Sequence, residues 1–87
     1  MNKEEKHTNM SKADKIFKKL GYEKIEIHDE ITGTFLMYDK IENKGKRRIS
    51  FFKDRKIECS ESYCYVGKID MPELQAINEK VKELKWN

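Results

Sequence analysis

The strongest constraint on this sequence is an amphipathic helix near its C-terminal end. We expect this helix to begin after Asp70 and to end at residue 84. Asp70 is suited to cap its free N–H groups, Pro72 is tolerated in the first turn, and Glu73 lies at the capping-box position. The apolar positions have the spacing of one helical face and are Leu74, Ile77, Val81 and Leu84.

This apolar stripe has two alternative roles. It either covers the protein's own sheet or stays exposed as a docking helix for a partner. We favour the first role, because the rest of the chain offers few other apolar residues to complete a core. On this interpretation the residues that lie off the buried stripe are Glu73, Ala76, Lys80 and Glu83.

A second, shorter helix is predicted near the other end of the sequence. Ser11 is suited to cap it, and Asp14 follows at the capping-box position. Gly21 is placed to end this helix, because glycine adopts positive φ freely. Tyr22 would then contact Phe17 across the helix ending. The two capped helices bracket the domain.

The residues between the helices have the alternation and the turn signals of short strands. We expect strands at 24–28, 34–38, 47–52 and 57–59, with 63–66 as a candidate fifth strand. The short links favour antiparallel neighbours, since a parallel crossover needs roughly a dozen residues or more. The sequence therefore predicts an α+β fold, in which an N-terminal helix, an antiparallel meander and a C-terminal helix follow one another and both helices cover one face of the sheet.

Alternation along the strands also predicts which side chains face the helices. The expected core residues of the sheet are Ile25, Ile27, Phe35, Met37, Ile49, Phe51 and Ile57. Alternation then places Leu36, Tyr38 and Phe52 on the other face.

The length of 87 residues is that of a single domain, and charged residues make up 40% of the chain. We expect residues 1–10 to form a mobile tail and residues 11–87 to form one domain with a highly charged surface. No run approaches the roughly 18 apolar residues of a membrane span, and the first residues lack the apolar region of a secretory signal. These features predict a cytoplasmic protein that does not enter a membrane.

Metal binding and catalysis find little support in the sequence. Cys59 and Cys64 have a Cys-x4-Cys spacing, without the second pair of ligands that a structural zinc site requires. Thiols in the cytoplasm stay reduced. His28 is predicted to lie on a solvated strand face, and no cofactor motif is present. We therefore expect a non-enzymatic protein without cofactor or metal.

The positive charge is concentrated in one segment. Residues 44–56 carry seven basic side chains and one acidic one, whereas the whole chain has a formal net charge of +3. The basic residues are Lys44, Lys46, Arg47, Arg48, Lys53, Arg55 and Lys56. They could bind nucleic acid or an acidic protein partner, or they could simply protect an edge hairpin from pairing. We expect Arg47 and Arg48 to be reached by solvent and to be dispensable for folding.

Residues 11–22, residues 71–79 and the closing Leu84-Lys85-Trp86 are similar to the two ends of a group of small uncharacterised proteins from phages and prophages of low-GC Gram-positive bacteria. The resemblance implies a phage or prophage accessory protein that works in a bacterial cytoplasm, and it implies no activity. Our hypothesis is a protein-interaction module, monomeric or weakly homodimeric, that binds a host or phage protein. Nucleic-acid binding through residues 44–56 is the alternative.

Overall fold

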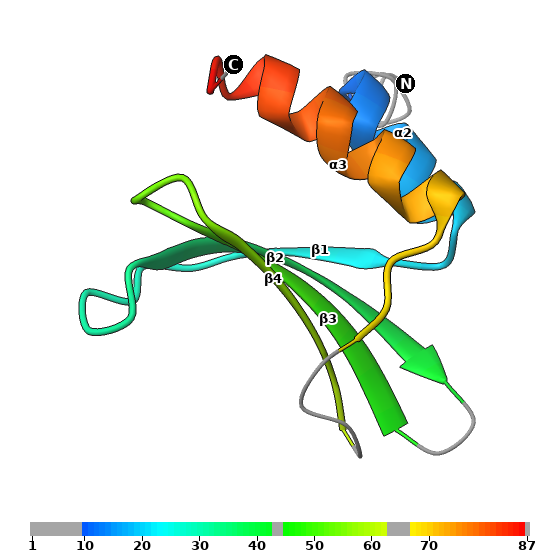
Figure 1. The fold of residues 1–87 in the computed structure, drawn as a ribbon, viewed down its shortest axis with the longest axis horizontal. Coiled ribbons are helices and arrows are strands. Elements are labelled where there is room, and N and C mark those ends of the chain that lie inside the picture. The colour runs from blue at the N-terminus through cyan, green and yellow to red at the C-terminus, as the bar shows by residue number, and fades with distance from the viewer. Residues whose placement is uncertain (1–9, 43–44, 63–66, 87) are drawn as a thin grey trace, which may run out of the picture.

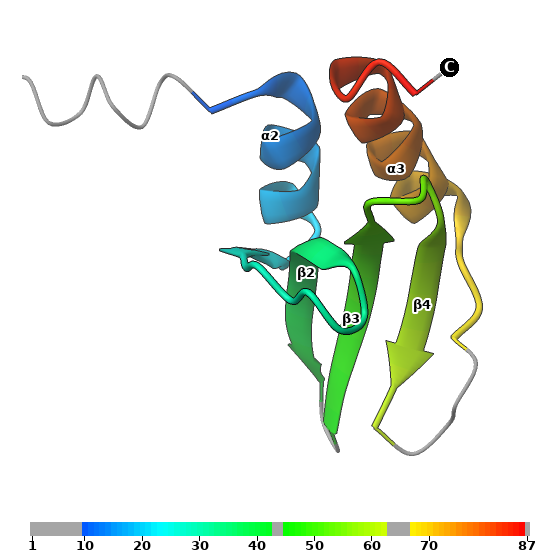
Figure 2. The ribbon, with the colours of Figure 1, turned by 90° about the vertical axis from the view of Figure 1, so that its left-hand side faces the viewer.

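The computed structural model describes residues 10–42, 45–62 and 67–86. Its elements, in chain order, are α2 (Lys12–Lys19), β1 (Glu23–Glu26), β2 (Thr34–Glu42), β3 (Gly45–Phe52), β4 (Ile57–Glu61) and α3 (Met71–Glu83). The strands form one antiparallel sheet in the order β1-β2-β3-β4, and both helices lie on one side of it (Figures 1 and 2). The predicted fold class is confirmed. The tail before Met10, Lys44 and the candidate strand at 63–66 lie outside the described residues.

Local sequence signals set both helices where they were predicted. Ser11 caps α2, and its hydroxyl accepts a hydrogen bond from the backbone N–H of Asp14 at 3.1 Å. Asp70 and Glu73 form a complete capping box at the start of α3. Each cap satisfies N–H groups that the first turn of a helix leaves without partners.

An aromatic cluster lies between α2 and the sheet. The rings of Phe17 and Tyr38 stack with their centroids 3.8 Å apart. Tyr22 meets Phe17 edge to face, and Phe51 meets Tyr38 in the same manner. Gly21, at φ +98°, ends α2 and turns the chain so that Tyr22 reaches Phe17, as the sequence predicts. Such aromatic pairs contribute beyond the area that they bury.

The prediction for the two faces of β2 was wrong. Leu36 and Tyr38 are buried in the core, so Met37 between them faces the open side of the sheet. Ile25 pairs with Met37 and faces the same open side. The strand is apolar on both faces, so alternation alone does not choose between them. Tyr38 decides the face, because its ring stacks in the core and its hydroxyl reaches Asp14.

An irregularity in the sheet explains the position of Phe35. The register between β2 and β3 shifts between Thr34 and Leu36. Phe35 therefore packs against the core next to Leu36, and its ring lies 6.0 Å from that of Trp86. Of the other predicted core residues, Ile49 and Phe51 are fully buried, and Ile57 is partly buried against the core. Ile25 and Ile27 are only partly buried and do not join the core cluster, so the prediction was wrong for these two residues.

Helix α3 buries a different stripe from the predicted one. Its buried residues are Glu73, Ala76, Ile77 and Lys80, whereas Leu74 is 38% exposed. Val81 and Leu84 are partly buried against the core. The helix is turned toward α2, against which it packs. Glu73 and Lys80 tolerate burial because each forms an ion pair with a charged side chain of another element.

The rotation of α3 predicts unequal costs for two similar substitutions. Ile77→Ala should lower the free energy of unfolding by about 2–5 kcal/mol, because it leaves a cavity beside the aromatic cluster. Leu74→Ala should lower it by no more than about 1 kcal/mol, because Leu74 is exposed. Urea unfolding followed by Trp86 fluorescence measures both. Equal losses would contradict the observed rotation.

Candidate functional site

The structure does not gather the predicted basic residues into one patch. The described basic side chains lie near the two opposite ends of β3, and one of them is buried inside the protein. With a rise of about 3.3 Å per residue, the two ends lie roughly 20 Å apart. Lys46 and Arg48 lie near the end of β3 that follows β2. The turn after β3 carries Lys53, Arg55 and Lys56. Arg47 is buried inside the protein.

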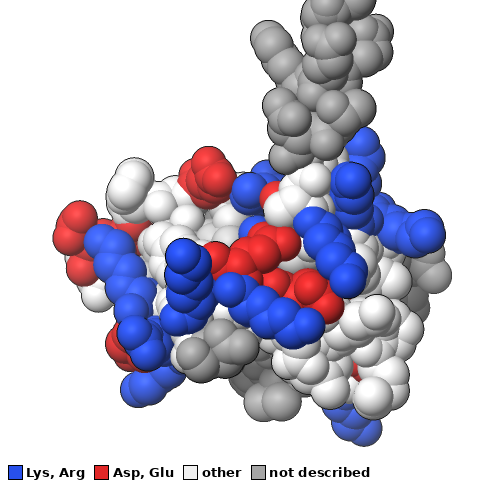
Figure 3. All heavy atoms as spheres, turned by 90° about the horizontal axis from the view of Figure 1, so that it is seen from above, with Lys and Arg blue, Asp and Glu red and all other residues white. Residues whose placement is uncertain are grey.

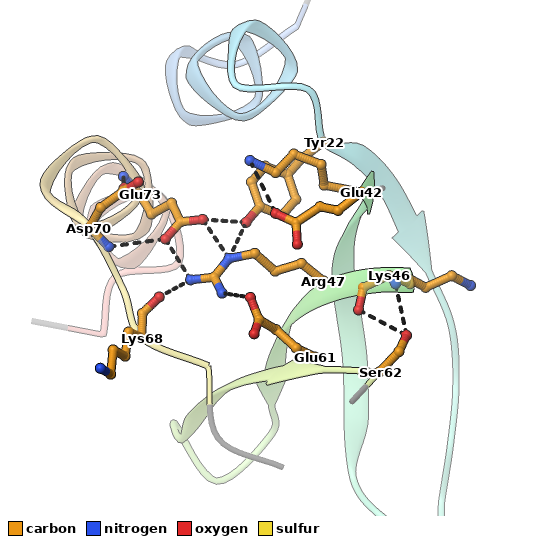
Figure 4. A network of polar contacts seen from close by, with 10 residues as sticks. Tyr22, Glu42, Lys46, Arg47, Glu61, Ser62, Lys68, Asp70 and Glu73 are labelled. Atoms are coloured by element: carbon orange, nitrogen blue, oxygen red, sulfur yellow. Dashed lines mark hydrogen bonds and ion pairs between the residues drawn. The ribbon is translucent and has the colours of Figure 1, made fainter. Parts of the chain in front are cut away.

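Arg47 is the centre of a buried network that joins four parts of the chain (Figure 4). Its guanidinium donates to both carboxylate oxygens of Glu73, on α3, at 2.7 Å each. It donates to Glu61, on β4, at 2.6 Å and to the backbone carbonyl of Lys68. Tyr22 accepts a hydrogen bond from Arg47 at 3.0 Å and donates one to Glu73 at 2.5 Å. Arg47 is 5% exposed, so the expectation that solvent reaches it was wrong.

The contacts in this network shift the pKa values of Glu73, Tyr22 and Arg47. Burial alone raises the pKa of Glu73, but the hydrogen bonds from Arg47 and Tyr22 outweigh it and lower that pKa to about 2. The pKa of Tyr22 is raised, first by burial and then by the adjacent Glu73. The hydrogen bonds to Glu73 raise the pKa of Arg47. Glu73 is therefore ionised and Tyr22 protonated near neutral pH, which makes the network a fixed anchor.

One sequence signal could have identified Arg47 as buried. Arg47 alternates with Ile49 and Phe51 along β3, and alternate residues of a strand share a face. Its partners were harder to foresee. Glu73 was predicted only as a helix cap, and Tyr22 only as a helix ending, because nothing in the local sequence links them to β3.

Removing Arg47 should destabilise the fold strongly. Arg47→Ala leaves the buried carboxylate of Glu73 without its main partner, a change that typically costs about 3–5 kcal/mol. Lys53→Ala is the matched control, because Lys53 is exposed and its nearest acidic group, on Glu30, lies 3.8 Å away. The control should stay within about 0.5 kcal/mol of the wild type. Chemical denaturation of both variants measures the difference, and a stable Arg47→Ala protein would contradict the anchor role.

A second polar network joins α2 to α3 and the sheet. Asp14 accepts hydrogen bonds from the hydroxyl of Tyr38 at 2.5 Å and from Lys24 at 2.9 Å. Lys80 lies 3.1 Å from Asp14 and 2.9 Å from Glu83. Burial alone raises the pKa of Asp14, but these donors outweigh it and lower that pKa to about 2. The interface between the two helices is thus held by charge as well as by packing.

The two lowered carboxylate pKa values predict acid sensitivity. Asp14 and Glu73 titrate at about 2 in the fold, below their ordinary values of 3.8 and 4.5. A depressed pKa contributes stability above the unfolded value and loses it as pH falls, so stability should drop between about pH 5 and about pH 2. Glu73→Gln should flatten this dependence, and Glu58→Gln, at an exposed position, should not. Denaturant midpoints measured across this pH range check the prediction.

Four of the basic residues that remain at the surface lie next to acidic groups, namely Lys46, Arg48, Lys53 and Lys56. Arg48 contacts the buried Asp39 at 2.8 Å, and Lys46 lies 3.6 Å from the same carboxylate. In the turn after β3, Lys56 lies 3.5 Å from Asp54. The helix side of the molecule also mixes both signs, with acidic side chains in the middle and basic ones around them (Figure 3). A depression of about 340 Å³ on the open face of the sheet is lined by Lys46, Arg48, Ser60, Glu61 and Ser62.

The outward face of α3 presents exposed apolar side chains beside a groove. Met71 is 73% exposed and Leu74 is 38% exposed, and Ile69, just before the helix, is 44% exposed. A groove of about 690 Å³ runs along this face and is lined by Met71, Pro72, Leu74, Gln75, Asn78, Glu79, Val81 and Lys82. Half of the stripe that the sequence assigned to the core therefore borders solvent.

Side chains for metal binding are not gathered in the part of the chain that the structure describes. Within it, no set of three or more His, Cys, Asp and Glu side chains is placed to hold a metal ion. Burial raises the pKa of the Cys59 thiol, which disfavours the reactive thiolate. His28 is exposed and follows β1, at the opposite edge of the sheet from Cys59 on β4. Among these same residues, no helix is long and apolar enough to span a membrane.

Comparisons with protein-family models, with curated proteins and with solved structures give no match to this chain.

Proposed function

We propose that this protein is a non-enzymatic interaction module of phage type, which binds a helix of a host or phage protein in the bacterial cytoplasm. The observation that carries the proposal is the outward face of α3, where apolar side chains border a groove of about 690 Å³. The resemblance of both chain ends to phage and prophage proteins supports the setting.

The spacing along this face favours a helical partner. Met71, Leu74, Asn78 and Val81 follow one another at intervals of three, four and three residues. This is the spacing of the seam in a coiled coil, where side chains of one helix fit between those of another. The exposed Asn78 lies in the middle of the seam, and a polar residue at such a position restricts register and partner choice. A seam of this length fits a short amphipathic helix.

The charges beside the groove favour binding that tolerates salt. Glu79 already lies 3.3 Å from Lys82 and 3.8 Å from Lys12. Because these groups neutralise one another, apolar contact would supply most of the affinity. The positions of the hairpin cations weigh against nucleic-acid binding, since Arg47 is buried and Arg48 contacts Asp39. Nucleic-acid affinity would instead fall steeply as salt rises.

Site-specific photo-crosslinking tests the proposal. A benzoylphenylalanine residue at position 74 should give one protein adduct in a lysate of a low-GC Gram-positive host, and the same residue at position 31 should not. Ile31 is the control because it is 94% exposed and lies in the link between β1 and β2. The adduct should survive nuclease, and the crosslinked peptide should map to a helix of the partner.

Quantitative binding completes the test. The purified partner should bind the wild-type chain with little change between low and high salt. Leu74→Lys should weaken binding by about tenfold or more, and Ile31→Lys should leave it unchanged. Binding to DNA or RNA that disappears with added salt, without a protein adduct at position 74, would refute the proposal and favour the alternative.

A further inference from the structure

Strand β1 is an edge of the sheet that no described residue pairs with on its outer side. The sheet order places β1 and β4 at the two edges. The β4 edge is partly covered, because the backbone N–H of Gly67 donates to the carbonyl of Cys59 at 3.1 Å. Among the described residues, β1 forms a backbone ladder only with β2. A bare edge offers N–H and C=O groups to another strand.

The backbone pattern shows which residues of β1 offer these groups. The N–H of Ile27, just after β1, donates to the carbonyl of Phe35, so it points toward β2. Backbone groups alternate in direction along a strand, so Ile25 also bonds toward β2. Lys24 and Glu26 therefore direct their backbone N–H and C=O groups outward.

The sequence of β1 is complementary to itself in the antiparallel direction. If two copies pair about a two-fold axis at Ile25, Lys24 of one copy lies opposite Glu26 of the other, and the same pair repeats on the other side of the axis. Lys24 and Glu26 are also the residues whose backbone groups point outward. The register that forms backbone hydrogen bonds between the copies is therefore the same register that sets opposite charges side by side. Within one copy, the Lys24 ammonium already lies 3.3 Å from the Glu26 carboxylate, which shows that these side chains share a face.

The neighbouring registers lack this agreement. A shift by two residues in one direction places Lys24 opposite Lys24 of the second copy, and a shift in the other direction places Glu26 opposite Glu26. Like charges directly opposite one another destabilise a strand pair. A shift by one residue places outward backbone groups opposite inward ones. Among these registers, only pairing about Ile25 satisfies the backbone groups and the side chains together.

The surroundings of the edge leave room for a second strand. The Glu26 side chain is 74% exposed. A groove of about 500 Å³ lies beside it on the helix side, bordered by Lys24, Ile27, His28 and Leu84 among others. On the open face, Ile25 lies beside Met37, so pairing would extend an apolar row from one copy into the next.

From these observations we infer that a second copy of this chain pairs with β1, so that the four strands of each copy form one continuous antiparallel sheet. The pairing is closed by its two-fold axis and therefore ends at a dimer. Because α3 lies over the other half of the sheet (Figure 2), its outward face stays free, and this inference stands independently of the proposed partner.

Sedimentation measures the association. The wild-type chain should show a dimer that grows with protein concentration. Glu26→Lys, which sets Lys opposite Lys24, should raise the dimer dissociation constant by roughly tenfold. Glu26→Pro removes an outward N–H and should abolish the dimer, whereas Glu26→Gln keeps that N–H and should weaken it less. The exposed position predicts that all three variants fold, which thermal melts verify.

Disulfide trapping tests the register. In a chain with Cys59→Ser and Cys64→Ser, Ile25→Cys should form an intermolecular disulfide on mild oxidation, because residue 25 meets itself on the axis. Ile27→Cys and the exposed Ile31→Cys measure trapping by collision and should react far more slowly. A wild-type chain that stays monomeric at millimolar concentration, or equal trapping at the three positions, would overturn the inference. So would a monomer whose β1 edge instead accepts an unrelated peptide.

Discussion

The fold depends on the ion pair between Arg47 and Glu73. It fixes the first turn of α3 to the middle of the sheet, and Tyr22 and Glu61 extend the connection to the end of α2 and to β4. Both charges are almost fully removed from water, so each needs the other. Glu73 also accepts a hydrogen bond from the backbone N–H of Asp70 within the capping box, so one carboxylate starts the helix and positions it. Helix formation and helix docking are therefore coupled through a single side chain.

The elements that depend on local chemistry were predictable from the sequence. Ser11, Gly21 and Asp70 act on their own neighbours, and the structure places both helix ends where these residues indicate. Which side chains of a strand or helix face the core was not predictable where the pattern of apolar residues was the only guide. Tyr38 faces inward because its hydroxyl donates a hydrogen bond to Asp14, and Lys80 is buried because it forms an ion pair with the same carboxylate. These partners lie far apart in the sequence, so hydropathy patterns do not contain the information.

The basic segment illustrates the same limit for a candidate site. Counting charges along the sequence treats seven cations as one cluster, but a strand directs successive side chains to opposite faces. Arg47 is thus separated from its neighbours Lys46 and Arg48, and two of the acidic groups that pair with these cations, Asp39 and Glu30, come from outside the segment. In the sequence, the stripe of Leu74, Ile77, Val81 and Leu84 was weighed as a docking surface, and the core role was favoured. Which of these residues stay exposed follows only from the rotation of α3, in which Glu73 and Lys80 are buried.

The contact between α2 and α3 has a consequence for biosynthesis. The backbone N–H of Ala13 donates to the carboxylate of Glu83 across 70 positions of sequence, and Asp14 meets Lys80 in the same interface. During translation, α2 leaves the ribosome long before the residues that cover it. Until α3 emerges, Phe17 and the sheet have no complete cover, and the ionised Asp14 lacks one of its partners. The nascent chain should therefore remain open and sensitive to proteases until α3 has left the ribosome, and it should then fold in one late step.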